Sequence, residues 1–232
     1  MRKQGEILFL TNNFEINRST SILSAKDIKR LSGDKWYHAT LLSYWDEICE
    51  KGILTTYNKD TSNSLDFGYG FYLALTAIQA EKFIAQQLKF ASVNENDRPL
   101  ILEFSFCPFQ FFESIQYSTR ILGSYDDEFA TFVFKNRTQN IAGTQQHEYD
   151  LMFGVMSDAL PLLLISEYSK GFKSEKEVLE SLKKQTSMKQ LSLHNQSICD
   201  TMHLTKAYTF SIEDCNRKET LDVEQYNRKK SN

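Results

Sequence analysis

Two short segments of this chain combine polar and aromatic side chains in a pattern suited to holding a flat ring. Residues 36–40 read WYHAT, with His38 at the centre, and residues 66–73 read DFGYGFYL. The two glycines of the second segment permit a close approach of backbone to ligand, and Phe71 and Tyr72 supply aromatic walls. Such a pocket favours a heteroaromatic ligand that needs stacking and one or two backbone hydrogen bonds.

Each segment also has a purely structural interpretation. Aromatic residues of an alternating strand commonly belong to the core, and a single histidine such as His38 is commonly a hydrogen-bonded structural residue. The pair Gly68 and Gly70 precedes a predicted strand and not a helix, and neither GxGxxG nor Gly-Lys-Ser/Thr follows. The pattern therefore excludes a doubly wound dinucleotide-binding turn and a phosphate loop.

The elements that must position these segments follow from periodicity and end signals. Gly52 is expected to end a helix in the left-handed conformation, and Ser174 with Glu177 predicts a capping box. Residues 129–134 fit either a helix or a strand. Short strands and helices that alternate early predict an α+β fold. The predicted strands are 36–40, 71–75, 99–106, 149–155 and 190–195, and the predicted helices are 25–31, 43–50, 77–90 and 174–185.

Length and composition predict one domain. The chain has 232 residues, of which 41% are hydrophobic and 25% charged, enough for one sizeable core. We expect an N-terminal extension over 1–34, the domain over 35–212 and a polar, solvated tail over 213–232. The net charge of -3 neither implies nor excludes a nucleic-acid partner.

Several observations predict a cytoplasmic protein without metal or membrane. The apolar run at 7–10 is too short for a signal peptide, and the run at 159–165 is far below membrane-spanning length. His147 and His194 lack further ligands at metal spacing. The cysteines lie too far apart to suggest a disulfide framework or a zinc site. They are Cys49, Cys107, Cys199 and Cys215.

The two segments and several later ones resemble a known superfamily. His38 in a Tyr-His-small-Thr strand, followed by Gly-aromatic-Tyr-Leu and a helix, is similar to the first two motifs of the His-Tyr-Glu group of ADP-ribosyltransferases. More narrowly, the chain resembles the bacterial domain-of-unknown-function 3990 family of that superfamily. The matching stretches are 66–73 with 79–80, 132–133 with 136–137, 149–150 with 154–155 and 158, and 190–196.

The resemblance implies an ADP-ribosyltransferase-like fold, in which two small packed antiparallel or mixed β-sheets with flanking helices form a cleft for NAD. NAD would be the substrate, with no metal. His38 would hydrogen-bond the adenosine ribose, Ala39 the nicotinamide amide through its backbone, and Thr40 would place a hydroxyl near the ribose. Tyr72 would line the nicotinamide pocket and Phe83 would stack on the ring. The full predicted NAD-binding set is His38, Ala39, Thr40, Gly70, Phe71, Tyr72 and Phe83.

The third motif departs from the group, because Gln190 stands where the enzymes carry glutamate. The predicted catalytic set is therefore His38, Tyr72 and Gln190. Glutamine cannot supply negative charge to an oxocarbenium-like centre; a full charge about 4 Å away is worth roughly 4 kcal/mol at an effective dielectric near 20, or about three orders of magnitude in rate. Candidate auxiliary acids are Glu148, Asp150 and Asp158, for which solvated strand ends or loop caps are the alternative interpretation.

These expectations combine into a mono-ADP-ribosyltransferase that acts as a bacterial toxin or antiphage effector. Its acceptor would be a protein or a nucleic acid, and an antitoxin is a candidate partner. Gln190 favours one alternative, an NAD-binding module with a degenerate catalytic site. An NAD glycohydrolase, with water as the acceptor, is the other.

Overall fold

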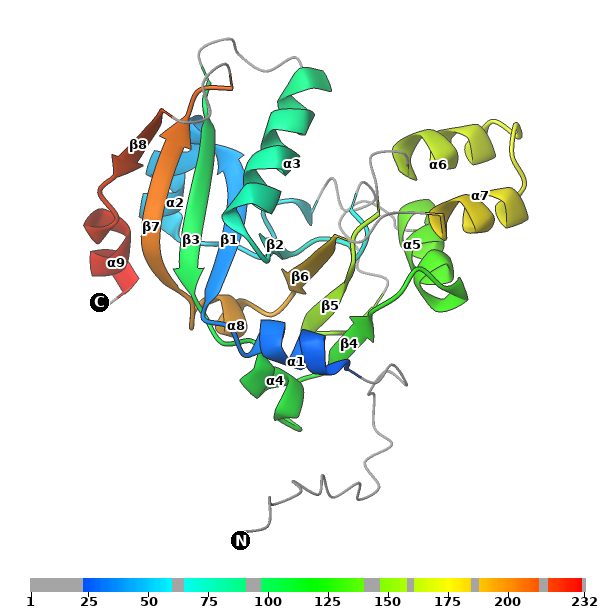
Figure 1. Ribbon diagram of the computed structural model, residues 1–232, viewed down its shortest axis with the longest axis horizontal. Helices are drawn as coiled ribbons and strands as arrows, with labels where there is room; N and C mark the ends of the chain where they lie inside the picture. The colour runs from blue at the N-terminus through cyan, green and yellow to red at the C-terminus, as the bar shows by residue number, and fades with distance from the viewer. Residues whose placement is uncertain are drawn as a thin grey trace, which may run out of the picture.

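Short strands build one mixed β-sheet from the described residues (Figure 1). The computed structural model describes residues 23–59, 65–90, 97–139, 147–157, 161–184, 188–212 and 217–230. The strands of its sheet are β1 (Lys35–Leu41), β2 (Phe71–Ala74), β3 (Pro99–Ser105), β4 (Thr119–Leu122), β5 (Leu151–Val155), β6 (Lys189–Leu193), β7 (His203–Phe210) and β8 (Lys218–Leu221).

The strand order β4-β5-β6-β2-β1-β3-β7-β8 corrects the expectation of two sheets. The described residues form a single sheet, in which β4 and β5 run parallel and the other neighbours run antiparallel. Its two halves meet at β1 and β2, which pair only at Tyr37 and Ala74. A single pair holds the halves together there, so the strands diverge beyond it.

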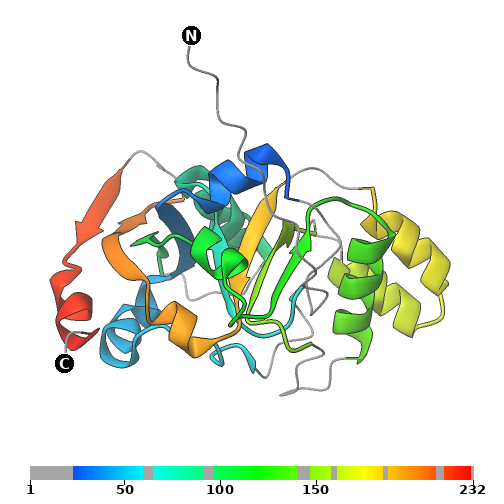
Figure 2. The ribbon, with the colours of Figure 1, turned by 90° about the horizontal axis from the view of Figure 1, so that it is seen from below.

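Helices cover both faces of the sheet, and Figure 2 shows α5–α7 gathered at one end with β8 and α9 at the other. One face packs on Leu31, Cys49, Phe111 and Tyr226 from the flanking helices. The helices are α1 (Ala25–Leu31), α2 (Trp45–Lys51) after the 3-10 turn η1 (Leu42–Tyr44), α3 (Ala77–Phe90), α4 (Phe109–Glu113), α5 (Asp127–Gln139), α6 (Pro161–Ser169), α7 (Glu175–Leu182), α8 (Gln196–Cys199) and α9 (Glu224–Lys230).

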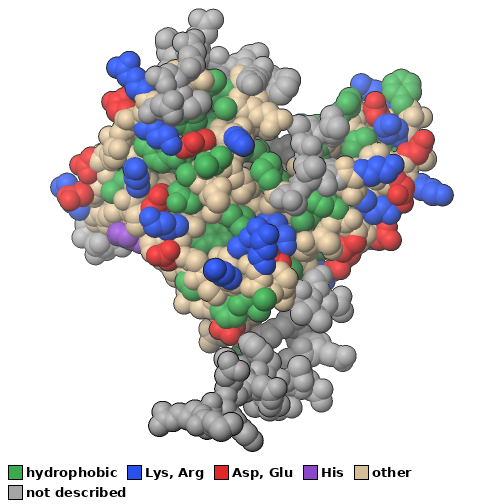
Figure 3. Space-filling model, viewed as in Figure 1, with side chains coloured by type: hydrophobic (Ala, Val, Ile, Leu, Met, Phe, Trp, Pro, Cys, Tyr) green, Lys and Arg blue, Asp and Glu red, His purple; other side chains and the backbone are tan. Residues whose placement is uncertain are grey.

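The opposite face carries two separate cores, one on each half of the sheet. Ala80 and Ile84 of α3 pack on β1, β3 and β7, while α5, α6 and α7 pack on β4 and β5 through residues such as Phe129 and Val178. Figure 3 shows positive and negative side chains interspersed over α6 and α7. Within the described residues, no helix has both the length and the apolar character to span a bilayer.

Local sequence signals located several elements correctly. The capping box of α7 forms, since Ser174 and Glu177 exchange hydrogen bonds. Gly52 follows α2 with φ 76° and ψ -169°, so its positive φ is confirmed although its ψ is extended. The ambiguous segment 129–134 lies inside the helix α5.

The C-terminal region differs from the solvated tail predicted for 213–232. Residues 218–221 add β8 to the edge of β7, with Leu221 opposite Ala207. On α9, Tyr226 is only 1% exposed and belongs to the core. The sequence did not reveal the buried position of Tyr226, because one apolar residue among charged ones produces no hydrophobic periodicity.

Candidate functional site

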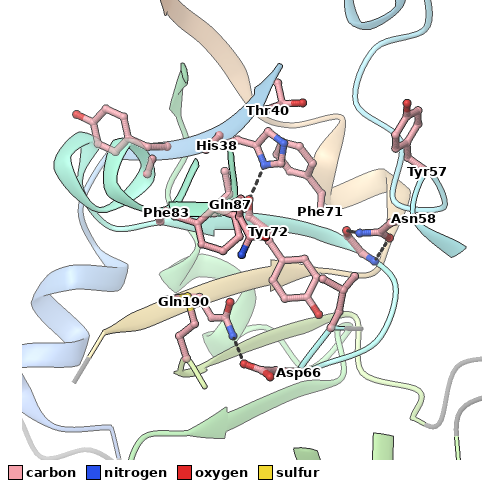
Figure 4. A pocket seen from close by; sticks show the side chains of 18 of the residues that line it. His38, Thr40, Tyr57, Asn58, Asp66, Phe71, Tyr72, Phe83, Gln87 and Gln190 are labelled. Atoms are coloured by element: carbon pink, nitrogen blue, oxygen red, sulfur yellow. Dashed lines mark hydrogen bonds between the residues drawn. The ribbon is translucent and has the colours of Figure 1, made fainter. Parts of the chain in front are cut away.

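A cavity of about 450 Å³ opens where β1 and β2 diverge, between α3 and the segment after β5 (Figure 4). Its size falls in the range of about 300–1,000 Å³ that small-molecule sites occupy. Residues from several distant segments of the chain line it together. Every residue of the predicted catalytic and NAD-binding sets is among them: His38, Ala39, Thr40, Gly70, Phe71, Tyr72, Phe83 and Gln190.

His38 fills the gap between the diverging strands. Its Nδ1 donates to the backbone oxygen of Tyr72 at 2.8 Å, where the β1–β2 ladder no longer continues. Its ring lies 4.2 Å from the ring of Phe71, centroid to centroid. Burial lowers the pKa of His38 to about 4, against the opposing effect of the hydrogen bond. The imidazole is therefore neutral at physiological pH, and Nε2 is left as a hydrogen-bond acceptor.

Tyr72 contributes its ring to the cavity and its hydroxyl to the loop before β2. The hydroxyl donates to Gly68 O at 2.7 Å and accepts from Phe67 N at 3.1 Å. Burial raises the pKa of Tyr72 well above its ordinary value, and the nearby carboxylate of Asp66 adds to the shift. The phenol thus stays protonated and is engaged by protein, so only the ring remains for a ligand.

Two histidines donate hydrogen bonds to the backbone of the same loop. His147 Nε2 donates to Phe67 O at 2.7 Å, and His194 Nδ1 donates to Tyr69 O at 2.7 Å. Burial lowers the pKa of both, that of His194 to about 3. Both rings are neutral donors in a structural role, and within the described residues no group of three or more His, Cys, Asp or Glu side chains is arranged to hold a metal ion.

Gly70 serves packing and loop geometry. Asn58 clamps its peptide groups from the side, with Nδ2 to Gly70 O and Oδ1 to Gly70 N, both at 3.0 Å. A Cβ at this position would lie 2.7 Å from His194 Nδ1 and 2.8 Å from Leu193 O. The close backbone approach expected at Gly70 is thus made to the end of β6, and Asn58 is a cavity residue that the sequence motifs did not mark.

Apolar side chains rim the mouth of the cavity. Phe83 of α3 is 41% exposed, and Tyr57 in the segment after α2 is 58% exposed. Lys51 and Lys82 also line it, the former paired with Glu47 at 2.8 Å. Exposed apolar residues concentrated around one opening are typical of a binding surface. The exposed rim residues are Tyr44, Leu54, Tyr57, Phe83, Leu162 and Met188.

Gln190 lies on the floor of the cavity beside the carboxylate of Asp66, a residue of the segment 66–73 for which we predicted no role of its own. Its Nε2 donates to Asp66 Oδ2 at 3.2 Å, and the two residues are 7% and 5% exposed. Asp66 also binds Arg137, with Nη2 at 2.8 Å from Oδ1, and Ser157, with N at 2.8 Å from Oδ2. The Ser157 hydroxyl donates to Oδ1 as well. The sequence carries one indication of this role, because Asp66 begins an aromatic, glycine-rich segment. A carboxylate that is buried in such a segment must be paired.

The two predicted auxiliary acids that the structure describes do not line the cavity. Glu148 is exposed and does not line the cavity. Asp150 accepts from Ser118 N and from Asn195 Nδ2, both at 2.8 Å, and so joins β4 to the end of β6. The alternative interpretation as a cap therefore describes Asp150. Asp158 lies outside the described residues.

Comparison with known proteins identifies one family. The model of a family described as "Protein of unknown function (DUF3990)" matches residues 53–204, which is more than half of the chain. The match includes Tyr72, Phe83 and Gln190, and it begins after His38. No curated protein matches the chain. No solved structure matches it either.

Proposed function

We propose, from the premise that this chain belongs to the DUF3990 family, that it is an NAD-dependent mono-ADP-ribosyltransferase with an ADP-ribosyltransferase-like fold. The observation that carries the proposal is the cavity, where His38, Tyr72 and Gln190 converge from three separate strands. Its aromatic and apolar lining with a few fixed polar groups suits nicotinamide and ribose. The open edge of β1 beyond Tyr37 leaves backbone groups for the nicotinamide amide.

The proposed reaction uses NAD as substrate. The bond between ribose C1′ and the nicotinamide nitrogen breaks, and its electron pair leaves with neutral nicotinamide. A nucleophilic oxygen or nitrogen of the acceptor then bonds C1′ and loses its proton to solvent. His38 Nε2 accepts a ribose hydroxyl, Gln190 holds the second ribose, and Lys51 and Lys82 offer positive charge for the diphosphate.

The apolar rim supports a macromolecular acceptor over water. Its exposed side chains surround the opening through which the second substrate must reach C1′. A protein or nucleic acid can cover such a surface, whereas hydrolysis needs none of it. Modification of a cellular macromolecule fits a toxin or antiphage effector controlled by an antitoxin.

His38 provides the direct test. Purified wild-type protein, incubated with NAD labelled in the adenosine moiety and a bacterial lysate, is expected to release nicotinamide and label a macromolecule. His38→Ala is expected to slow release by about tenfold or more, because a ligand hydrogen bond and the tie to Tyr72 are lost. His203→Ala, at an exposed position of β7, is the matched control. Folded wild-type protein that releases no nicotinamide contradicts the proposal.

A second candidate, an NAD-binding module without turnover, is favoured by one observation. The described acids that line the cavity are Glu47 and Asp66, and each is paired with a cation. The products separate the alternatives. Thermal stabilisation by NAD without nicotinamide release identifies the module, and free ADP-ribose without labelled macromolecule identifies a glycohydrolase.

A further inference from the structure

The orientation of the Gln190 side chain is dictated by its neighbour. A carboxylate offers only acceptors, so the amide must turn its NH₂ group toward Asp66, as the 3.2 Å contact shows. Its oxygen Oε1 then points away from Asp66 and into the cavity (Figure 4). Gln190 is thereby presented to a ligand as an acceptor, which is also what a carboxylate would present.

Asp66 itself is not presented to a ligand. Arg137 Nε and Nη2 and the Ser157 hydroxyl donate to Oδ1, while Ser157 N and Gln190 Nε2 donate to Oδ2. These donors fill the lone pairs of a side chain that is 5% exposed. The charged and titratable described groups that face the Asp66–Gln190 pair are Arg137 from α5 and Tyr72 from β2.

We propose that Asp66 is a positioning residue that locks the Gln190 amide, so that Oε1 accepts a hydroxyl of the reacting ribose. This inference rests on the proposed function. The charge-assisted hydrogen bond from Gln190 to Asp66 also polarises the amide and makes Oε1 a stronger acceptor. The glutamine is therefore matched to Asp66 and is not a decayed glutamate.

The pairing makes Gln190→Glu a sharp test. Repulsion between two carboxylates at about the 3.2 Å of the present contact raises the pKa of the pair, so the pair retains one proton over a range of pH. While protonated, the introduced acid can donate to Asp66 and still direct an acceptor oxygen into the cavity. When that proton is lost, repulsion turns the side chain away. We expect kcat for nicotinamide release by Q190E to fall about tenfold for each pH unit above the apparent pKa of the pair, while the wild-type profile stays flat.

The reciprocal exchange tests the same contact without a second carboxylate. In Asp66→Asn combined with Gln190→Glu, one amide and one carboxylate remain, in swapped places. The double variant is expected to lose the steep pH profile of Q190E and to recover at least tenfold in kcat at alkaline pH, with KM changed little. Gln87→Glu adds the same charge to the cavity from α3. Among the described side chains, Gln87 is not one of those that hydrogen-bond Asp66, so Asp66→Asn should not rescue this variant.

Measurement over about pH 5 to 9 of kcat, KM and the free energy of unfolding separates the outcomes. A Q190E profile like that of the wild type overturns the positioning role, as does full activity of Q190E at alkaline pH. Should the double variant fail to fold, the profile of Q190E alone still decides. A folded wild type that neither binds NAD nor releases nicotinamide overturns the proposed function, and with it the catalytic role of the pair.

Discussion

Gly70 shows that a residue of a sequence motif can be required for packing around a site and not for contact with its ligand. Because a Cβ would lie 2.7 Å from His194 Nδ1 and 2.8 Å from Leu193 O, any side chain forces β2 away from the end of β6. Gly70→Ala is expected to lower the free energy of unfolding by about 1–3 kcal/mol, measured by urea denaturation. At Gly123 the nearest atom lies 3.8 Å away, so Gly123→Ala is expected to change stability by no more than about 0.5 kcal/mol. Equal effects of the two changes would contradict this account.

Asp66 shows the opposite case, a residue whose type did not disclose its role. It stands in the most specific matching segment, yet the acids chosen from the sequence were Glu148, Asp150 and Asp158. The choice between them depended on which strand end faces the cavity. The order of the strands in the sheet determines which strand end faces the cavity. The spacing of carboxylates along the chain does not reveal this order.

The loop before β2 is held by side chains in place of a backbone ladder. The carbonyl oxygens of residues 67–70 each accept from a side-chain donor, and the carbonyl oxygen of Tyr72 within β2 accepts from His38. Those donors are His147, Tyr72, His194 and Asn58. Three of the five groups are neutral histidines, so the shape of the cavity depends on their remaining uncharged.

This dependence predicts acid sensitivity. The folded protein keeps His38 and His194 neutral, with pKa values of about 4 and 3, whereas the unfolded chain takes up protons near pH 6.5. Their stabilisation is complete above about pH 6.5 and is lost as pH falls toward 4 and below, because the unfolded state then binds more protons. Urea denaturation at a series of pH values measures this slope.

The histidine responsible can be identified by replacement. His38→Gln removes one titrating group and should reduce the slope of stability against pH between about 4 and 6.5. His203→Gln, at an exposed position, should leave the slope as in the wild type. A slope unchanged by both replacements would show that other groups govern the response.

Across the molecule, the sheet extends further toward the C-terminus than the polarity of the chain suggests. Tyr226 anchors α9 in the same core as Trp36 and Cys49. Tyr226→Ala is expected to lower the free energy of unfolding by about 3–5 kcal/mol, as for other large buried aromatic residues. Arg228→Ala on the exposed side of α9 should change it by no more than about 0.5 kcal/mol. Chemical denaturation of both variants measures the difference, and equal losses would place Tyr226 outside the core.

Much of the fold was predictable wherever the signal was local. The period of apolar residues located α3, the capping box located α7, and runs of aromatic or aliphatic residues located β1, β2, β3, β5 and β6. The strands β4, β7 and β8 were missed, because their residues mix polar and apolar character and become strands through pairing with neighbours.

The amino-acid sequence was sufficient to select His38, Gln190 and a segment, 66–73, of which Asp66 and residues 70–73 line the same cavity, since type and order along the chain carry that information. It could not show that the halves of the sheet join through a single β1–β2 pair, nor that Asp66 faces Gln190. Both features are contacts between segments far apart in the chain. Such contacts arise only when burial brings the segments together, and a buried carboxylate then takes whichever partners the fold supplies.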